Sequence, residues 1–162
     1  MENMPMNVVI LGSIPEATLV LLMGLALLGI RGNWKKVLII GIIQGVLSYF
    51  TRRYLLFGMH TVTLYLTMTL LTWLIIKTNI LVAAIASALG MIINSLIEGV
   101  LLSIIINFTA ITLPEILSRD WLRIAVTTPK QIVLLILVYL CLKYSFTLDE
   151  DIHIFKRIKE RA

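Results

Sequence analysis

Charged residues are scarce in this chain. Lys, Arg, Asp and Glu together make up 14% of the 162 residues, and apolar residues make up 59%. Soluble domains have about 25% charged and roughly 45–50% apolar residues, and a small one has much surface to cover with polar groups. A disordered chain is also excluded, because disorder requires low hydrophobicity. With a mean hydropathy of +0.99, the composition predicts a multi-pass membrane protein with almost nothing left for a globular domain.

The chain also has few of the residues that catalytic and metal sites require. Its single cysteine, Cys141, cannot form an internal disulfide, and we expect it to be a small buried apolar side chain. The two histidines, His60 and His153, are far apart in the sequence. No HExxH, GxSxG or P-loop motif is present. We therefore expect a protein that is not an enzyme and that has no catalytic residue, cofactor or metal site.

Basic residues outnumber acidic ones, and the formal net charge is +5. In a soluble protein this excess would suggest nucleic-acid binding. Here Lys and Arg gather between apolar runs and near the C-terminus, where anionic lipid and the positive-inside rule favour them. The charge therefore predicts a lipid bilayer as the surroundings and no nucleic-acid partner.

Five apolar runs divide the chain, and they lack the alternation of barrel strands. The runs are Asn7–Ile30, Val37–Phe50, Met59–Ile76, Ile80–Phe108 and Ile124–Leu142. A spanning helix needs about 20 residues. The second run is short, and it spans only if Thr51–Leu56 joins it and its arginines extend to the membrane surface. We predict an all-α, polytopic membrane helix bundle of about five transmembrane helices over residues 1–145.

Two further segments have amphipathic patterns. Thr112 and Glu115 are spaced as in a capping box, and the apolar residues that follow share one helical face, which predicts a short interfacial helix near 113–123. Residues 146–162 form a short basic amphipathic tail. With five spans the connectors alternate sides, and most Lys and Arg fall on the side of this tail. The positive-inside rule then places the C-terminus in the cytoplasm and the N-terminus outside the cell membrane.

Three ionisable residues lie inside the predicted spans: Glu16, Glu98 and Lys130. Such residues are costly in lipid and usually face a protein interior or a wet cavity. Counted from the outer helix ends at 1.5 Å per residue, all three lie roughly 10–14 Å deep, and Gln44 falls in the same layer. The Coulomb energy favours a pair between Lys130 and one carboxylate. The remaining carboxylate would be protonated, hydrated or matched by a cationic group from outside.

Neighbouring residues support a shared polar site. Small and polar residues follow one face of the fourth run: Ala83, Ser87, Gly90, Asn94 and Glu98. Gln131 shares a face with Lys130. Pro15 and Pro129 directly precede Glu16 and Lys130, and a proline frees a carbonyl one turn earlier and often kinks a transmembrane helix. These features suit a ligand site or a hinge; alternatively, the charges only tie the helices together.

A second group of residues is expected at the outer surface. His60 lies near the outer end of the third run, close in sequence to Arg52 and Arg53. These three residues could bind an anionic ligand, or the imidazole could respond to pH. The alternative is an interfacial histidine with no such role.

Two short motifs resemble a known family. Leu27-Leu28-Gly29-Ile30-Arg31 and Phe57-Gly58-Met59-His60-Thr61 resemble the multi-pass N-terminal membrane sensing region of Gram-positive sensor histidine kinases. The resemblance covers most of residues 8–145. It implies a membrane receptor that passes its signal to a cytoplasmic kinase. This chain has no dimerisation helix, phospho-acceptor module or ATP-binding domain up to Ala162, so we expect a stand-alone relative that works through a partner.

Three functions therefore remain open. The first is a non-enzymatic membrane sensor or regulatory subunit, with a polar ligand pocket in the outer half of the bilayer. It would signal through a homodimer or a partner membrane or cytoplasmic protein such as a kinase. The second is a small transporter or the substrate-binding subunit of an energy-coupling uptake system. The third is a structural membrane assembly protein.

Overall fold

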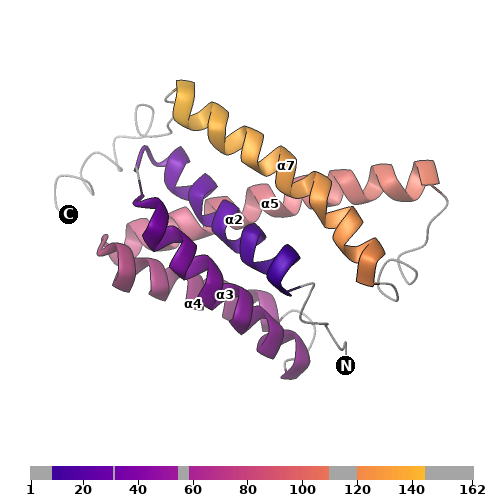
Figure 1. Ribbon diagram of the computed structural model, residues 1–162. Helices are drawn as coiled ribbons and strands as arrows, with labels where there is room; N and C mark the ends of the chain where they lie inside the picture. Colours follow the sequence, from indigo (N-terminus) through magenta and orange to yellow (C-terminus); the bar gives the residue numbers. More distant parts are fainter. Residues whose placement is uncertain (1–8, 31, 55–58, 110–119, 145–162) are drawn as a thin grey trace.

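The structure is a computed structural model that describes residues 9–30, 32–54, 59–109 and 120–144. These segments are helical and contain no strand. A π-helical turn, η1 (Val9–Ser13), leads directly into α2 (Ile14–Leu27). The other helices are α3 (Trp34–Tyr54), α4 (Met59–Ile76), α5 (Ile80–Thr109) and α7 (Asp120–Tyr144) (Figure 1).

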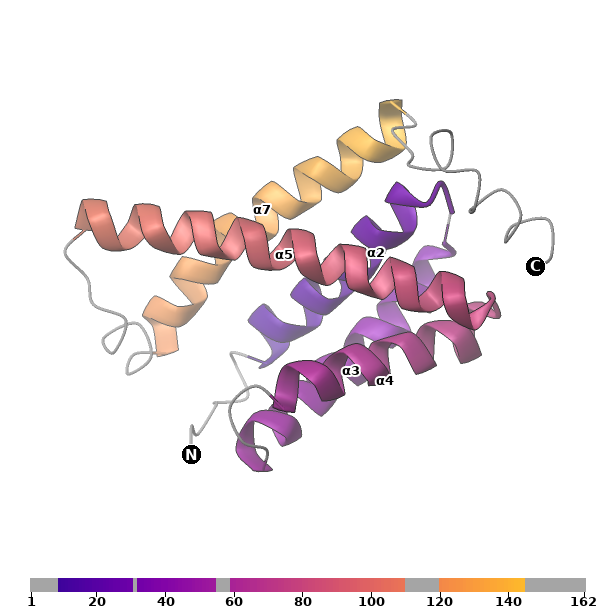
Figure 2. The ribbon, with the colours of Figure 1, turned by 180° about the vertical axis from the view of Figure 1, so that it is seen from behind.

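Helix α2 lies at the centre of the bundle. It contacts α3, α5 and α7, while α4 packs against α3 and α5 (Figures 1 and 2). Over its described length α2 exposes no large apolar side chain, whereas α3, α4, α5 and α7 each expose several. Exposed apolar side chains on the outer helices are what a bilayer solvates. The apolar core therefore surrounds α2, and lipid is the natural surroundings of the other four helices.

Helix α2 ends in a Schellman motif, which accounts for the glycine at this point in the sequence. Gly29 has the left-handed φ of 67°. Its N–H donates to the carbonyl of Ala26 at 3.0 Å, and the N–H of Ile30 donates to that of Leu25 at 2.9 Å. The chain then turns back, so that α3 runs antiparallel to α2 (Figure 1).

The small-residue face predicted on α5 lies against α2. Ala83, Ser87 and Gly90 are all buried. A Cβ atom on Gly90 would collide with the backbone of Val20, and one on Gly24 of α2 would collide with the backbone of Ala86. Small residues at a crossing let two membrane helices approach closely. The two glycines therefore set the short distance between α2 and α5.

The structure confirms an all-helical bundle with membrane-spanning character. Four segments are long and apolar enough to cross a bilayer: Ile10–Leu27, Met59–Ile76, Ile80–Thr109 and Ile124–Tyr144. Helix α3 has 21 residues but is not among these four. It begins at Trp34 and ends at Tyr54, so it includes the basic residues at both ends of the second apolar run. The fifth span stays a prediction.

Two predicted segments lie wholly or mainly outside the described residues. The basic tail at 146–162 is one. The other is the interfacial helix near 113–123, of which residues 113–119 are outside the description and 120–123 form the first turn of α7. Helix α7 thus begins at Asp120 rather than at Ile124, where the apolar run begins.

Candidate functional site

The structure brings Glu16, Glu98 and Lys130 together from three helices, α2, α5 and α7. The Nζ atom of Lys130 donates to Oε1 of Glu16 at 2.7 Å and to Oε2 of Glu98 at 3.0 Å. One ammonium group thus lies between two carboxylates. When all three groups are ionised, this charged cluster has one more negative than positive charge.

The three side chains differ in burial. Lys130 is 4% exposed, Glu16 is 23% exposed and Glu98 is 55% exposed. More than half of the Glu98 side chain is thus exposed within the described bundle, although the residue lies inside a predicted span. The C-terminal half of α5 extends beyond α2 and has α7 beside it (Figure 2), so the outer part of this helix is covered on fewer sides. Only Lys130 is fully enclosed, and both of its partners reach it from less buried positions.

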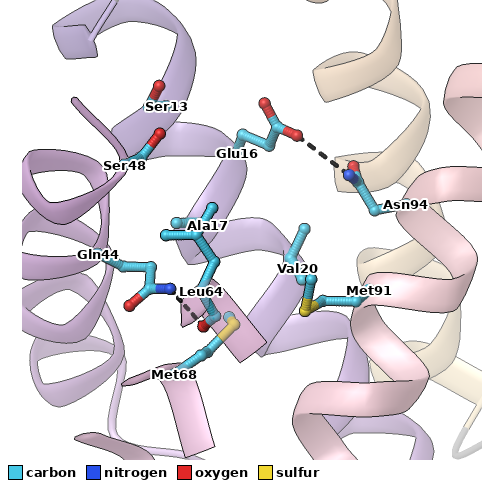
Figure 3. Close-up of a pocket in the computed structure, with 10 residues that line it drawn as sticks. All are labelled: Ser13, Glu16, Ala17, Val20, Gln44, Ser48, Leu64, Met68, Met91 and Asn94. Carbon is cyan, nitrogen blue, oxygen red and sulfur yellow. Dashed lines mark hydrogen bonds between the residues drawn. The ribbon is translucent and has the colours of Figure 1, made fainter. Parts of the chain in front are cut away.

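Asn94 joins the cluster from α5. Its Nδ2 atom donates to Oε1 of Glu16 at 3.0 Å (Figure 3), so this one carboxylate oxygen accepts from both Asn94 and Lys130. The other oxygen, Oε2, accepts from none of the residues that the structure describes. The Oδ1 atom of Asn94 is buried and also lacks a partner within the described part of the chain. Two acceptors are thus left unused beside the ion pair.

Gln131 of α7 bonds η1, the turn that leads into α2. Pro15 has no N–H to donate to the carbonyl of Leu11 one turn earlier. The Nε2 atom of Gln131 donates to that carbonyl at 3.2 Å and to the carbonyl of Gly12 at 3.1 Å. A carbonyl freed by proline is therefore used within the protein. This amide has a positioning role and does not line the cavity described next.

A cavity of about 90 Å³ lies beside the cluster, between α2, α3, α4 and α5. Glu16, Asn94 and two serines lie toward one end of it, and apolar side chains lie toward the other, with Gln44 beside Leu64 (Figure 3). Its lining consists of Ser13, Glu16, Ala17, Val20, Gln44, Ser48, Leu64, Met68, Met91 and Asn94. Glu16 and Asn94 belong to both the cavity lining and the charged cluster, whereas Lys130 and Glu98 belong to the cluster alone. The site thus has two connected parts.

Gln44 lines the cavity, but its amide is already occupied. Its Nε2 atom donates to the carbonyl of Leu64 at 2.6 Å, and its Oε1 atom accepts from the hydroxyl of Thr67 at 3.2 Å. The side chain is buried. It therefore ties α3 to α4 across the cavity wall, while Glu16 and Asn94 each keep an acceptor that no described residue uses.

Two serines of the cavity were not predicted from the sequence. Ser13 ends η1, and Ser48 lies one turn after Gln44 on α3; both are buried. Neither hydroxyl bonds another described residue. The spacing of four between Gln44 and Ser48 placed both on one face of α3 and was a usable signal. Ser13 offered none beyond its place before Pro15.

The predicted outer-surface group stays a prediction. The side chains of Arg52 and Arg53 lie outside the described part of the structure. His60 is the second residue of α4, and its Nε2 atom shares a hydrogen bond with the Thr61 hydroxyl at 3.2 Å.

Comparisons of the chain with protein-family models, with curated proteins and with solved structures found no match.

Proposed function

We propose that this chain is a non-enzymatic membrane sensor or regulatory subunit, with its ligand site in the cavity beside Glu16. The observation that carries the proposal is that Glu16 belongs to the cavity wall and also bonds Lys130 of α7 at 2.7 Å. An occupant that bonds the Glu16 carboxylate therefore acts directly on a contact that holds α7. The resemblance to the sensing regions of histidine kinases supports the same function.

The proposed signal passes along α7. Pro129 lies inside this helix, directly before Lys130, and prolines are common points of bending in transmembrane helices. A weaker bond between Lys130 and Glu16 would let α7 pivot there. The motion would reach the basic tail and, through it, a cytoplasmic partner such as a kinase.

The proposed topology has five spans. Helix α3 would be the fifth, since 21 residues at 1.5 Å each extend about 30 Å, the thickness of the hydrocarbon core. Its terminal basic side chains would extend to the headgroups. The N-terminus would lie outside the cell, the C-terminus inside, the segment near 113–123 on the outer surface, and the cavity in the outer half of the bilayer.

Pulsed EPR distances between α4 and α7 test the proposal. Spin labels would replace Leu74 and Leu142, which are exposed, in a Cys141→Ala background in lipid nanodiscs. The cluster would be neutralised by combining Glu16→Gln, Glu98→Gln and Lys130→Met. This combination removes the ion pair without leaving an unpaired charge, the costly outcome of a single change.

We expect the triple variant to stay helical and to shift the distance by on the order of 1–2 Å or to broaden its distribution, the scale of known helix shifts. Thr128→Val is the matched control. Thr128 is exposed on α7 and bonds only the carbonyl of Ile124 in its own helix, so this variant should leave the distance unchanged. An unchanged distance in a folded triple variant would reject the signalling proposal and favour a structural tie.

A transporter or substrate-binding subunit is the second candidate. The position of the cavity inside the bundle, walled by four helices, favours it, since transporters bind substrates between helices within the membrane. Proteoliposomes would be tested with radiolabelled small cations, anions and neutral solutes. Uptake that depends on the protein would support transport, and its absence would count against it.

A further inference from the structure

We infer that the cavity binds a compact cation with N–H donors, namely the ammonium group of a small primary amine. This inference rests on the proposed ligand site and names the chemistry of its ligand. It follows from the charge around the cavity, from the acceptors left unused there and from the size and composition of the walls.

The charge favours a cation over an anion. The cluster has two carboxylates for one ammonium group. Among the described residues that line the cavity there is no Lys, Arg or His, while Glu16 supplies a carboxylate. A charge inside a bilayer is costly unless a partner of opposite sign is near. Lys130 bonds both carboxylates, so a bound cation would offset the remaining excess negative charge, whereas an anion would add to it.

The polar atoms of the lining that lack a partner include several acceptors. Oε2 of Glu16 and Oδ1 of Asn94 accept no hydrogen bond from the described residues. The hydroxyls of Ser13 and Ser48 add two groups that can accept. A buried acceptor without a partner costs free energy, and an ammonium group presents three N–H donors that can satisfy several acceptors at once. The set therefore matches a primary ammonium better than a carboxylate, a phosphate or a hydrocarbon.

The cavity has room for a small ligand. The space open to the centre of a water-sized sphere is about 90 Å³, well above the roughly 10–15 Å³ that a single water needs. Methylammonium and ethylammonium fit in this space. Leu64, Met68 and Met91 form the apolar end of the cavity (Figure 3), where one or two carbon atoms would lie while the nitrogen faces Glu16.

The walls do not suit two other kinds of cation. A quaternary ammonium has no N–H and is usually held by aromatic side chains, and the described lining of the cavity includes no Phe, Tyr or Trp. A divalent metal ion requires several charged ligands, and the described residues include no group of three His, Cys, Asp or Glu side chains that could hold one. A sodium ion surrounded by oxygen atoms is the remaining competitor, and the experiment includes it.

Binding of ethylammonium tests the inference. The full-length protein in phosphatidylcholine nanodiscs would be titrated with radiolabelled ethylammonium in a scintillation proximity assay. Sodium, tetramethylammonium, ethanol and acetate would be the competitors. We expect saturable binding that unlabelled ethylammonium displaces and that the other four displace at least about tenfold less well, because each lacks the charge, the donors or the size. Equal displacement by sodium or by tetramethylammonium would overturn the inference.

Two glutamate variants provide a matched comparison. Glu16→Gln and Glu98→Gln each remove one carboxylate from Lys130, but only Glu16 lines the cavity. We expect Glu16→Gln to weaken ethylammonium binding at least about tenfold, the effect of losing a charged hydrogen-bond partner. Glu98→Gln should weaken it by about threefold or less. Equal losses in the two variants would overturn the inference, because they would indicate an effect of folding alone.

A second variant keeps the test decisive if Glu16→Gln does not fold. Asn94→Leu retains the ion pair between Lys130 and Glu16 and removes Oδ1 from the cavity wall. It should also weaken ethylammonium binding several-fold, and unchanged binding would contradict the assigned acceptors.

Repeating the titration in phosphatidylethanolamine nanodiscs identifies the source of the amine. A lower affinity there would mean that the lipid headgroup competes for the site, and an equal affinity would mean that a free amine is the ligand.

The two proposals can fail separately. If ethylammonium does not bind but the cluster variant still shifts α7 in the EPR experiment, the ligand class is wrong and the sensor proposal stands. If ethylammonium binds and α7 does not shift, the site is correct and the signalling proposal is wrong.

Discussion

Lys130 is a buried ammonium group in an apolar bundle, and its two carboxylate partners make that position tolerable. A charge removed from water is costly unless it is paired and hydrogen-bonded. Glu16 and Glu98 supply this pairing from two other helices. Glu16 is mostly buried and also bonds Asn94, whereas more than half of Glu98 is exposed. The three residues should therefore differ in how much stability their replacement removes.

We expect Lys130→Met to destabilise the protein by about 3–5 kcal/mol, because it leaves two carboxylates close together without a cation. Glu98→Gln should cost only about 1–2 kcal/mol, because Lys130 keeps Glu16 and an amide oxygen still accepts a hydrogen bond. Unfolding of both variants in mixed micelles, followed by circular dichroism against the mole fraction of SDS, measures the difference. Equal losses in the two variants would contradict this account, because they would mean that the pair between Lys130 and Glu16 adds nothing to stability once Glu98 is replaced.

At this scale, counting residues along each span was enough to predict that Glu16, Glu98 and Lys130 lie near one another, and their side chains do meet. It could not give the burial of Glu98, because depth along a helix contains no information on which helices lie beside it. The occupied amide of Gln44 was unpredictable for the same reason, since its partners Leu64 and Thr67 belong to a neighbouring helix. Residue types and spacing thus predicted the charged cluster, while the cavity depends on the lateral order of the helices.

At the scale of helices, two glycines on α5 have opposite surroundings. A Cβ atom at Gly90 would collide with the backbone of α2, whereas a Cβ atom at Gly99 would meet no atom within 4 Å. Gly90 lies where α2 and α5 cross, and Gly99 lies on the exposed outer part of α5. Replacing each glycine with alanine therefore separates two effects on stability: the cost of steric overlap with α2 at Gly90, and the gain in helix propensity at Gly99.

We expect Gly90→Ala to destabilise the bundle by about 1–3 kcal/mol, because a well-packed backbone contact must open to admit a methyl group. Gly99→Ala should be neutral or stabilise the protein by roughly 0.5–1 kcal/mol, because alanine is the better helix former. Thermal unfolding of the two variants in the same detergent gives the comparison. A stable Gly90→Ala protein would mean that α2 and α5 are not in close contact.

The junction between η1 and α7 gives a further prediction. Gln131→Leu removes the donor to the exposed carbonyl of Leu11 and the part-buried carbonyl of Gly12 and should cost about 0.5–1.5 kcal/mol, the net value of an ordinary hydrogen bond. Hydrogen exchange locates the effect: amides of Val9–Ser13 should exchange faster, while those in the middle of α5 should not. Faster exchange throughout the bundle would instead indicate a general loss of packing.

Helix boundaries were the least predictable part of the fold. Hydropathy identified each apolar run, but α3 begins at Trp34 and includes Lys35 and Lys36, which precede the run. Helix α7 likewise begins at Asp120, before its apolar run. Backbone hydrogen bonding continues through charged residues at a helix end, because their long side chains can extend toward water. The small-residue face of α5, in contrast, was predictable, because it depends on helical periodicity alone.

At the scale of the whole molecule, the helices run in alternating directions. Helix α2 begins and α7 ends at opposite ends of the bundle, and α3 runs back between α2 and α4 (Figure 1). Because α3 is antiparallel to α2 and to α4, its two ends lie at opposite ends of the bundle. If α2 and α4 both cross the bilayer completely, α3 must return the chain from one side to the other. Connectivity thus supports a span that hydropathy alone does not select.

Cysteine accessibility tests this topology directly. Single cysteines at Trp34, Met59 and Ile80, all exposed positions, would be introduced with Cys141→Ala. Intact cells would then be treated with a membrane-impermeant maleimide. We expect labelling at Met59 and protection at Trp34 and Ile80, because the positive-inside rule puts the basic connectors in the cytoplasm. After permeabilisation all three should react, which controls for burial. If α3 did not cross, Trp34 and Met59 would be accessible from the same side. Glu16 and Lys130 would then no longer belong to helices that enter the membrane from one common side, and the proposed outer ligand site would have to be abandoned.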